Sequence, residues 1–251
     1  MYVLLTGTKR QDDPLASILT AAGAIVAHCP MVKIVPPQSY TQLDKALREL
    51  ESYDWALFTS RYAVESCIER LAHLSLSFPS RLSVLAVGRS TAKILFQNDI
   101  KVSLMPEIFN AEAAVSALLE KLESVKGLKF FFPRSAQGRE TLIDRLSALG
   151  AYVHFVEAYQ TVVPEDAKTS LAKLLERCPD VVTFASPSAV RNLAELLLPI
   201  PLYQALCSSL IACIGPVTAA AVKEQGLPVD IVAEEASSEA LAKAVLSRFT
   251  S

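Results

Sequence analysis

The feature that most constrains this chain is a pattern of strands and helices that is written twice along its length. In each copy a short apolar run leads into a helical segment that ends at a glycine, and a second apolar run follows. Leu5 and Gly23 are 18 positions apart, and Phe132 and Gly150 are also 18 positions apart. Apolar runs that alternate with helices predict a parallel sheet covered on both faces. We therefore expect two similar α/β units.

Further short segments recur in both copies, in the same order and at nearly equal spacing. They pair 58–64 with 184–190, 86–92 with 213–219, and 110–113 with 237–240. A repeat of more than 100 residues is of domain size, which excludes a solenoid of short units. The pattern therefore predicts an internal duplication of one α/β domain.

Composition excludes several classes of protein. The formal net charge is −2, so no general basic surface for nucleic acid is expected. The five cysteines include no Cys-x-x-Cys pair and the three histidines are scattered, so neither a metal site nor a disulfide framework is expected. The sequence has no dinucleotide-binding or P-loop fingerprint. No apolar run approaches a membrane span and the N-terminus does not resemble a signal peptide, which predicts a cytoplasmic protein without a membrane partner.

Polar turns follow the expected strands, and each turn precedes a helix. They carry Ser, Thr or Gly, and in three of them Arg61, Arg89 and Arg134 add a positive charge. Ligands of open α/β sheets bind outside the carboxyl ends of the strands, and helix N-termini favour anions. Ser and Thr also cap ordinary helices, so any single turn can be purely structural. Together the turns predict a cleft between two domains that binds several carboxylates or phosphates. They are 6–8, 59–61, 88–91, 133–135, 186–188 and 215–218.

At these positions the chain resembles the uroporphyrinogen-III synthase family. The resemblance rests on Phe-x-Ser-Pro-Ser-Ala-Val at 184–190, Ile-Gly-Pro-x-Thr-Ala at 214–219 and Glu-Ala-Tyr-Gln-Thr at 157–161, and it spans essentially the whole chain. It implies two similar α/β domains, each a parallel sheet flanked by helices, joined by a two-stranded extended linker. It also implies a lyase of haem biosynthesis, which converts linear hydroxymethylbilane to cyclic uroporphyrinogen III with loss of water and inversion of ring D. Such an enzyme uses no cofactor and no metal, and the resemblance suggests a monomer.

The resemblance also changes the expected domain limits. A plain tandem repeat would divide the chain near Val125–Leu128. In the family the first domain holds both ends of the chain, so here it would comprise residues 1–32 and 165–251. The second domain would comprise residues 38–158. The linker strands, which would form a hinge, would be 33–37 and 159–164.

The expected chemistry is mainly control of geometry, because the bilane can lose its hydroxyl and close without ring inversion unaided. A weak general acid would assist departure of the hydroxyl, and the motif assigns this role to Tyr159. Tyr159 could instead pack on the linker with its hydroxyl satisfied by the backbone, and Arg61 and Arg134 could be solvated surface residues. The residues expected to bind substrate, by turn hydroxyls or bidentate guanidinium pairs, are Ser60, Arg61, Thr91, Arg134, Ser135, Ser186, Ser188, Thr218 and Ser238.

A non-catalytic binder is the alternative function. Two α/β domains joined by two crossings also describe hinge-type proteins that bind a small polyanionic ligand. The reaction product separates the two possibilities, because only the enzyme would form type III product from hydroxymethylbilane.

Overall fold

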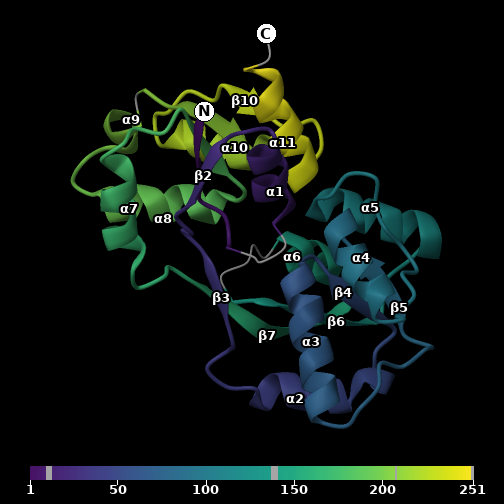
Figure 1. Ribbon diagram of the computed structural model, residues 1–251. Coiled ribbons are helices and arrows are strands. Elements are labelled where there is room, and N and C mark those ends of the chain that lie inside the picture. The colour runs from purple at the N-terminus through teal and green to yellow at the C-terminus, as the bar shows by residue number, and fades with distance from the viewer. Residues whose placement is uncertain (10–12, 137–140, 207, 250–251) are drawn as a thin grey trace. The chain divides into compact units, whose positions relative to one another are not determined.

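The computed structural model describes residues 1–9, 13–136, 141–206 and 208–249 (Figure 1). The chain divides into two compact units. Met1–Lys33 and Val162–Ser251 form one, which we call the terminal unit, and Ile34–Thr161 forms the other, which we call the central unit. No helix within the described ranges is long and apolar enough to cross a membrane.

Within the described residues, the terminal unit holds a five-stranded sheet in the order β10-β9-β8-β1-β2, with parallel pairing between neighbours. Strands β1 and β8 are buried along their whole length, as parallel strands are when helices cover both faces of a sheet. The strands are β1 (Tyr2–Leu5), β2 (Ile25–His28), β8 (Val181–Phe184), β9 (Leu210–Cys213) and β10 (Ile231–Val232). The helices are α1 (Pro14–Ala21), α7 (Ala167–Leu175), α8 (Pro187–Leu197), α9 (Leu202–Ala205), α10 (Pro216–Glu224) and α11 (Ser238–Ser247).

In the part of the chain that the structure describes, the central unit also holds a five-stranded sheet, in the order β3-β7-β6-β4-β5. Strand β4 pairs in parallel with β5 and β6, and β6 pairs in parallel with β7. The strands are β3 (Lys33–Val35), β4 (Trp55–Phe58), β5 (Ser83–Ala86), β6 (Lys129–Ser135) and β7 (Tyr152–Val162). The helices are α2 (Thr41–Arg48), the 3-10 helix η1 (Leu50–Ser52), α3 (Arg61–His73), α4 (Arg89–Gln97), α5 (Ala111–Leu122) and α6 (Thr141–Ala148).

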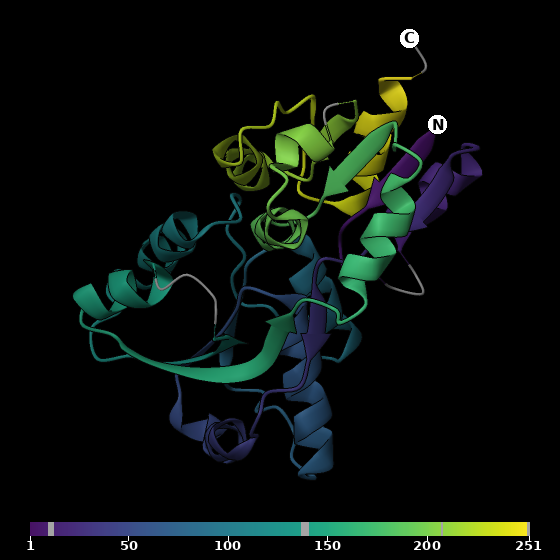
Figure 2. The same cartoon turned by 90° about the vertical axis from the view of Figure 1, so that its left-hand side faces the viewer.

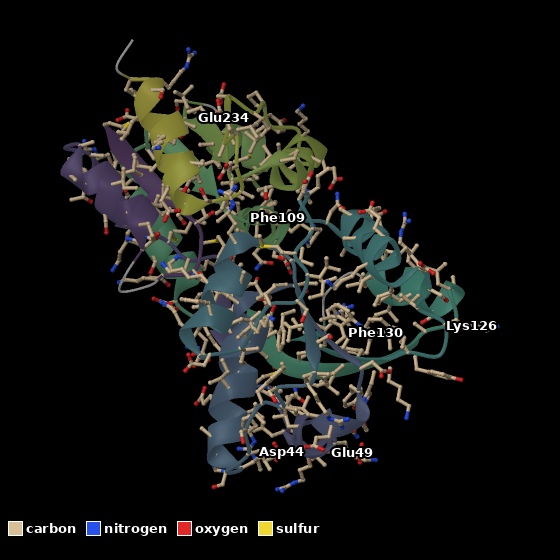
Figure 3. All side chains as sticks on the ribbon, turned by 90° about the vertical axis from the view of Figure 1, so that its right-hand side faces the viewer. Asp44, Glu49, Phe109, Lys126, Phe130 and Glu234 are labelled. Atoms are coloured by element: carbon tan, nitrogen blue, oxygen red, sulfur yellow. The ribbon has the colours of Figure 1, made fainter. Side chains whose placement is uncertain are left out.

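Two apolar clusters lie on opposite faces of the central sheet. Phe130 and Phe131 are consecutive in β6, so their side chains point to opposite faces. Phe131 packs with Val64 of α3 in one cluster. Phe130, labelled in Figure 3, packs with Leu118 of α5 and Leu146 of α6 in the other. The sheet is therefore buried on both sides, and its edges and strand ends are the places left for a ligand.

Glycine ends equivalent helices in the two copies of the repeat. Gly23 follows α1 with φ of 83°, and Gly150 follows α6 with φ of 82°. This left-handed conformation is open to glycine at little cost, which is why glycine so often ends a helix. The helix ends that the sequence predicted at these two positions are confirmed.

The two copies of the repeat exchange strands between the sheets. By order along the chain β1 corresponds to β6, β2 to β7, β4 to β8 and β5 to β9. The terminal sheet joins β1 and β2 of the first copy to β8, β9 and β10 of the second. The central sheet joins β4 and β5 of the first copy to β6 and β7 of the second. The expected fold class, two similar parallel α/β units built by duplication, is confirmed.

Two aspartates anchor the exchanged strands in the same way. The Asp54 carboxylate accepts the backbone N–H of Lys129 at 2.8 Å, and the Asp180 carboxylate accepts that of Tyr2 at 2.6 Å. Each aspartate also donates its own N–H to the carbonyl of the same partner, at 2.9 Å in both cases. The residue before β4 thus holds the first residue of β6, and the residue before β8 holds the first residue of β1. In both cases the strand held in this way comes from the other copy of the repeat.

Strand β7 is longer than the sequence suggested. The resemblance implied that the second domain ends at residue 158 and that a separate linker strand spans 159–164. The structure has one long, curved strand from Tyr152 to Val162 (Figure 2). Its partner β6 continues past the phenylalanines at 130–132 to Ser135, which gives β7 a ladder to follow.

Candidate active site

The carboxyl ends of the strands lead directly into helices in both units. In the central unit β4 leads into α3 and β5 into α4, and in the terminal unit β8 leads into α8 and β9 into α10. Figure 3 shows Phe109, which precedes α5, and Asp44 at opposite ends of the central unit. Asp44 pairs with Arg70 in the last turn of α3, so α3 begins at the Phe109 end. In the central unit, the carboxyl ends of β4 and β5 and the N-termini of α3 and α4 therefore lie at the end marked by Phe109.

Serine and asparagine side chains cap several of these helices. Ser60 accepts the Tyr62 N–H at 3.2 Å at the start of α3, and Ser186 accepts the Ala189 N–H at 3.2 Å at the start of α8. The caps of α5 and α11 are Asn110 and Ser237, so Ser238 lies one residue inside its helix. These contacts satisfy backbone donors that a helix leaves open. Ser60 and Ser186 are thus structural caps first, and any contact with substrate is an additional role.

Helices α4 and α10 begin differently, at a glycine. No side chain caps either N-terminus among the described residues, and the residues at the cap position are Gly88 and Gly215. Thr91 and Thr218 lie in the first turns of these helices and are buried, at 2% and 3% exposed. The Thr91 hydroxyl donates to the carbonyl of Val87 at 3.2 Å, which orders the turn. The N–H groups of these uncapped ends suit an anion better than those of the capped helices.

A cluster of hydroxyl and aromatic groups surrounds Tyr159 in the central unit. The Tyr159 hydroxyl donates to Ser60 Oγ at 3.1 Å, and the Tyr159 and Tyr62 rings lie 5.9 Å apart at 56°. Arg61 places its guanidinium 4.7 Å from the centre of the Tyr62 ring and donates to the Tyr62 hydroxyl at 2.8 Å. Four side chains from β7 and the β4–α3 turn therefore form one continuous polar and aromatic group. Since Arg61 is half-buried and bonded, it is not a freely solvated residue.

Packing fixes the backbone on which Tyr159 stands. Ser66, in the second turn of α3, donates its hydroxyl to the carbonyl of Ala158 at 2.5 Å. Ala158 is fully buried in the cluster that α3 forms with the sheet. The residue before Tyr159 is thus held by the same helix whose N-terminal cap receives the Tyr159 hydroxyl.

Burial raises the pKa of Tyr159, and this effect is larger than the others acting on it. The hydrogen bond to Ser60 and the charge of Arg134 lower the pKa, whereas Tyr62 raises it. The phenol therefore keeps its proton at neutral pH, and a proton is what a general acid must hold.

Pro133, Arg134 and Ser135 are not a turn, and this expectation was wrong. They form the last residues of β6, because pairing with β7 continues to Ser135 and Tyr159 with a shift in register after Arg134. Arg134 is 5% exposed, so it is no solvated surface residue. Its guanidinium lies over the rings of Phe132 and Phe155. The Ser135 hydroxyl is buried and has no hydrogen-bond partner among the described residues.

The terminal unit has the same helix cap but lacks the aromatic and charged partners. Ser186 caps α8, and the next two residues are Pro187 and Ser188 where the central unit has an arginine and a tyrosine. Among the described residues, the Ser186 hydroxyl accepts the Ala189 N–H and receives no tyrosine hydroxyl. The chemical groups of the repeat are therefore concentrated in the central unit.

The sequence missed two members of this cluster. Tyr62 follows Arg61 in the α3 turn, and its aromatic character at a helix N-terminus was the available signal. Ser66 carries no such signal, because its role depends on how α3 packs against β7.

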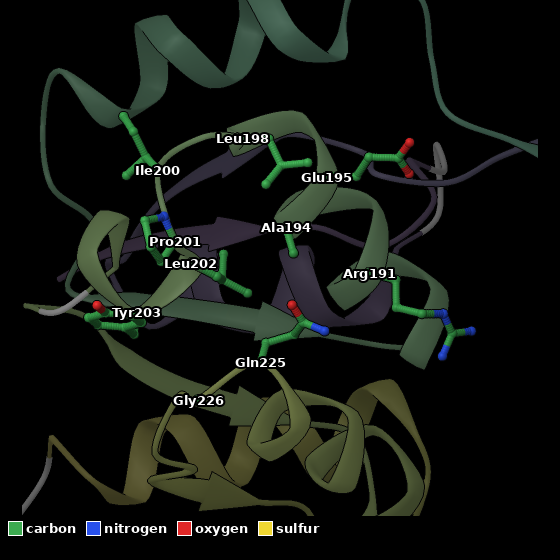
Figure 4. Close-up of a pocket in the computed structure, with 10 residues that line it drawn as sticks. All are labelled: Arg191, Ala194, Glu195, Leu198, Ile200, Pro201, Leu202, Tyr203, Gln225 and Gly226. Carbon is green, nitrogen blue, oxygen red and sulfur yellow. The ribbon is translucent and has the colours of Figure 1, made fainter.

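A hollow of about 420 Å³ lies elsewhere, on the terminal unit (Figure 4). Its lining includes Leu198, Ile200 and Tyr203, between the end of α8 and α9. It thus lies away from the strand ends that lead into α8 and α10. No three His, Cys, Asp or Glu side chains of the described ranges are grouped as metal ligands would be.

Comparison with known proteins identifies the family. A family model described as uroporphyrinogen-III synthase HemD matches residues 13–243. The chain is 31% identical over 252 residues to a uroporphyrinogen-III synthase of Synechococcus elongatus, covering 97% of this chain and 93% of the relative. It is 27% identical to that of Chlorobaculum parvum over 251 residues, covering 97% of both.

Solved structures show the same fold. A mutant uroporphyrinogen III synthase from Thermus thermophilus matches 99% of this chain and 98% of its own with a TM-score of 0.73 and 19% identity. The uroporphyrinogen-III synthetase of Helicobacter pylori matches 98% and 99% with a TM-score of 0.66 and 17% identity. With the family model covering most of the sequence, the resemblance read from the motifs is confirmed, and the chain belongs to the uroporphyrinogen-III synthase family.

Proposed function

We propose that this chain closes linear hydroxymethylbilane to uroporphyrinogen III, with loss of water and inversion of ring D, and so acts as a lyase of haem biosynthesis. Family membership supports the reaction. The observation that carries the proposal for the site is the hydrogen bond from Tyr159 to Ser60 at 3.1 Å, at the strand ends of the central unit. It places a protonated phenol and an aliphatic hydroxyl together in a partly buried position.

Tyr159 is proposed as the general acid that assists departure of the substrate hydroxyl. The required acid is weak, because the bilane loses this hydroxyl unaided. The more demanding task is to bring a substituted pyrrole carbon into attack, which depends on how the chain is held. Most residues of the site would therefore bind substrate without transferring protons.

The carboxylates of the substrate are proposed to bind at the helix N-termini and at nearby side chains. The uncapped starts of α4 and α10 offer backbone N–H groups, and Arg61 offers a guanidinium that already faces an aromatic ring. Arg134 is buried, so we assign it electrostatic support of the site together with the proposed carboxylate contact. The other proposed binding residues are Ser60, Thr91, Ser135, Ser186, Ser188, Thr218 and Ser238.

A coupled assay tests the function directly. Purified protein is supplied with hydroxymethylbilane as it is formed, and the oxidised products are separated by chromatography. The expected result is type III product at a rate proportional to protein concentration. Accumulation of type I product alone, which is the outcome without enzyme, would reject the proposal.

The non-catalytic binder is not favoured, because the relatives that cover nearly the whole chain are named as synthases. The substrate class, a small molecule, follows from the family. The domain limits at 1–32 with 165–251 and 38–158, with linkers 33–37 and 159–164, stay part of the proposal. So do a monomeric state, a cytoplasmic location and the lack of a nucleic-acid partner.

A further inference from the structure

The Ser60 hydroxyl receives two hydrogen bonds and gives none to any described residue. Tyr159 donates its phenolic proton to Ser60 Oγ at 3.1 Å, and the Tyr62 N–H donates to the same oxygen at 3.2 Å. A serine oxygen has two lone pairs and one proton. Both lone pairs are occupied, so the Ser60 proton points away from Tyr159 and from the helix. Ser60 is half-buried.

While this hydrogen bond exists, the phenolic proton of Tyr159 is directed at Ser60 Oγ. A phenol has one proton, and here it lies on the line between the two oxygens. Burial raises the pKa of Tyr159, which keeps that proton in place. Of the two hydroxyls, Ser60 is therefore the one whose proton is not donated to a described residue.

We propose that Ser60 is the catalytic residue that delivers the proton to the departing hydroxyl, and that Tyr159 reloads it. This inference rests on the proposed function. The Ser60 O–H bond breaks as its proton moves to the substrate hydroxyl, and the C–O bond breaks with its electron pair leaving in water. The pyrrole nitrogen supplies the electrons that stabilise the carbon left behind. The Tyr159 proton moves to Ser60 Oγ, and Tyr159 becomes a phenolate.

The proton that the substrate loses after ring closure restores the starting state. It returns to Tyr159 through Ser60 by the reverse path, so the net change is the loss of one water. The phenolate that exists between these steps is partly buried in the central unit. Arg134, on the neighbouring strand β6, lowers the pKa of Tyr159, which is the direction that favours a transient phenolate.

The terminal unit supplies a matched comparison. Ser186 also caps α8, but within the described residues its hydroxyl accepts only the Ala189 N–H and no tyrosine hydroxyl. A serine cap at this place in the repeat is therefore sufficient for the fold without a tyrosine behind it. Capping of α3 by Ser60 therefore does not by itself require the hydrogen bond from Tyr159.

Replacement of Ser60 by Asn separates proton transfer from positioning. Asparagine is a strong helix cap and can accept the Tyr159 hydrogen bond, but its amide cannot pass a proton on. We expect Ser60→Asn to lose kcat by about a hundredfold with a small change in KM, and Ser60→Thr to keep most of kcat. The matched variant Ser186→Asn should lose far less kcat and mainly raise KM. Thermal unfolding of each variant checks that the fold is retained.

A double variant tests whether the two hydroxyls act as one chain. Ser60→Asn combined with Tyr159→Phe should be no slower than the slower single variant, since either change breaks the same path. Parent-like kcat in Ser60→Asn, equal losses in Ser60→Asn and Ser60→Thr, or losses that multiply in the double variant would each overturn the relay. Each of these outcomes is measured relative to a parent protein that forms type III product. If the parent itself forms no type III product, it is the proposed function that fails.

Discussion

Tyr159 and Ser60 are 99 residues apart in the chain and meet because β7 and the β4–α3 turn reach the same end of the central sheet. Tyr159 was identified from a short motif, whereas its hydroxyl partner depends on the packing of α3. The same residues also correct the view of the two arginines. Arg61 is bonded to Tyr62 and Arg134 is buried, so their charges act on a fixed local arrangement.

At the residue scale, Tyr159→Phe should lower kcat by about 10²-fold to 10⁴-fold, the range typical of a lost general acid. The ring is retained and one hydrogen bond is lost, so the free energy of unfolding should fall by only about 1 kcal/mol. The rate of type III formation and urea unfolding measure the two effects.

Tyr152→Phe is the control for this change. Tyr152 lies on the same strand β7, at its far end, and is 67% exposed. Tyr152→Phe should leave kcat and the free energy of unfolding near those of the parent. Equal rates of type III formation in Tyr159→Phe and the parent would remove Tyr159 from the acid role.

At the scale of elements, strand length and strand anchoring shape the site. Strand β6 continues beyond its apolar run to Ser135 because β7 offers a partner along the whole distance. This places Arg134 in a strand and buries it, where local sequence had favoured a turn. The aspartates Asp54 and Asp180 then each hold the first residue of a strand from the other copy.

Asp180→Ala should destabilise the terminal unit by about 1 kcal/mol, because the Tyr2 N–H loses its carboxylate acceptor. Asp180→Asn should cost less, since an amide oxygen can still accept. Unfolding in urea measures both. Asp144→Ala, at an exposed helical position of α6, serves as the control and should change stability little. A parent-like unfolding free energy in Asp180→Ala would show that the backbone hydrogen bonds alone hold β1.

The pairing of α2 with α3 should make stability depend on pH. Arg70 donates two hydrogen bonds to the Asp44 carboxylate, at 2.5 and 2.7 Å, and holds the pKa of Asp44 below its ordinary value. A lowered folded-state pKa stabilises the fold above the unfolded pKa of about 3.9, and the effect is lost as pH falls through the folded value. The stability difference between the parent and Asp44→Asn should thus be largest at neutral pH.

Urea unfolding at neutral pH and at about pH 3 measures this dependence. The difference between the parent and Asp44→Asn should shrink at the lower pH. Glu51→Gln is the control, because its pair with Arg81 is largely exposed, at 79% and 64%. A difference that stays constant with pH would mean that the Asp44–Arg70 pair contributes by packing and not by charge.

At the scale of the whole molecule, each compact unit contains strands of both copies of the repeat. A chain divided in this way cannot be cut near residue 125 into two self-sufficient halves, because each half would lack strands of its own sheet. The chemical groups at the serine caps are nevertheless unequal, since Arg61 and Tyr62 follow Ser60 in the central unit, whereas Pro187 and Ser188 follow Ser186 in the terminal unit.

Binding of the proposed product should stabilise the folded chain. At a hundred times its Kd, uroporphyrinogen III should raise the free energy of unfolding by about 2.7 kcal/mol. For a chain of this size about 1 kcal/mol corresponds to a Tm shift of about 2–4 °C, so Tm should rise by roughly 5 to 10 °C. Thermal scans with and without product measure this, and a single pyrrole with two carboxylates is the control. No shift at saturating product would contradict binding by this fold.

The sequence by itself determined the alternation of strands and helices, the duplication, the glycines that end α1 and α6, and the serine caps. These features depend on residues close together in the chain, where periodicity and backbone preference act directly. The tertiary structure alone decided that Lys129 meets Asp54, 75 residues away, and that Tyr159 meets Ser60. Such contacts depend on which strands pair and how helices pack on them, and no local pattern specifies that choice.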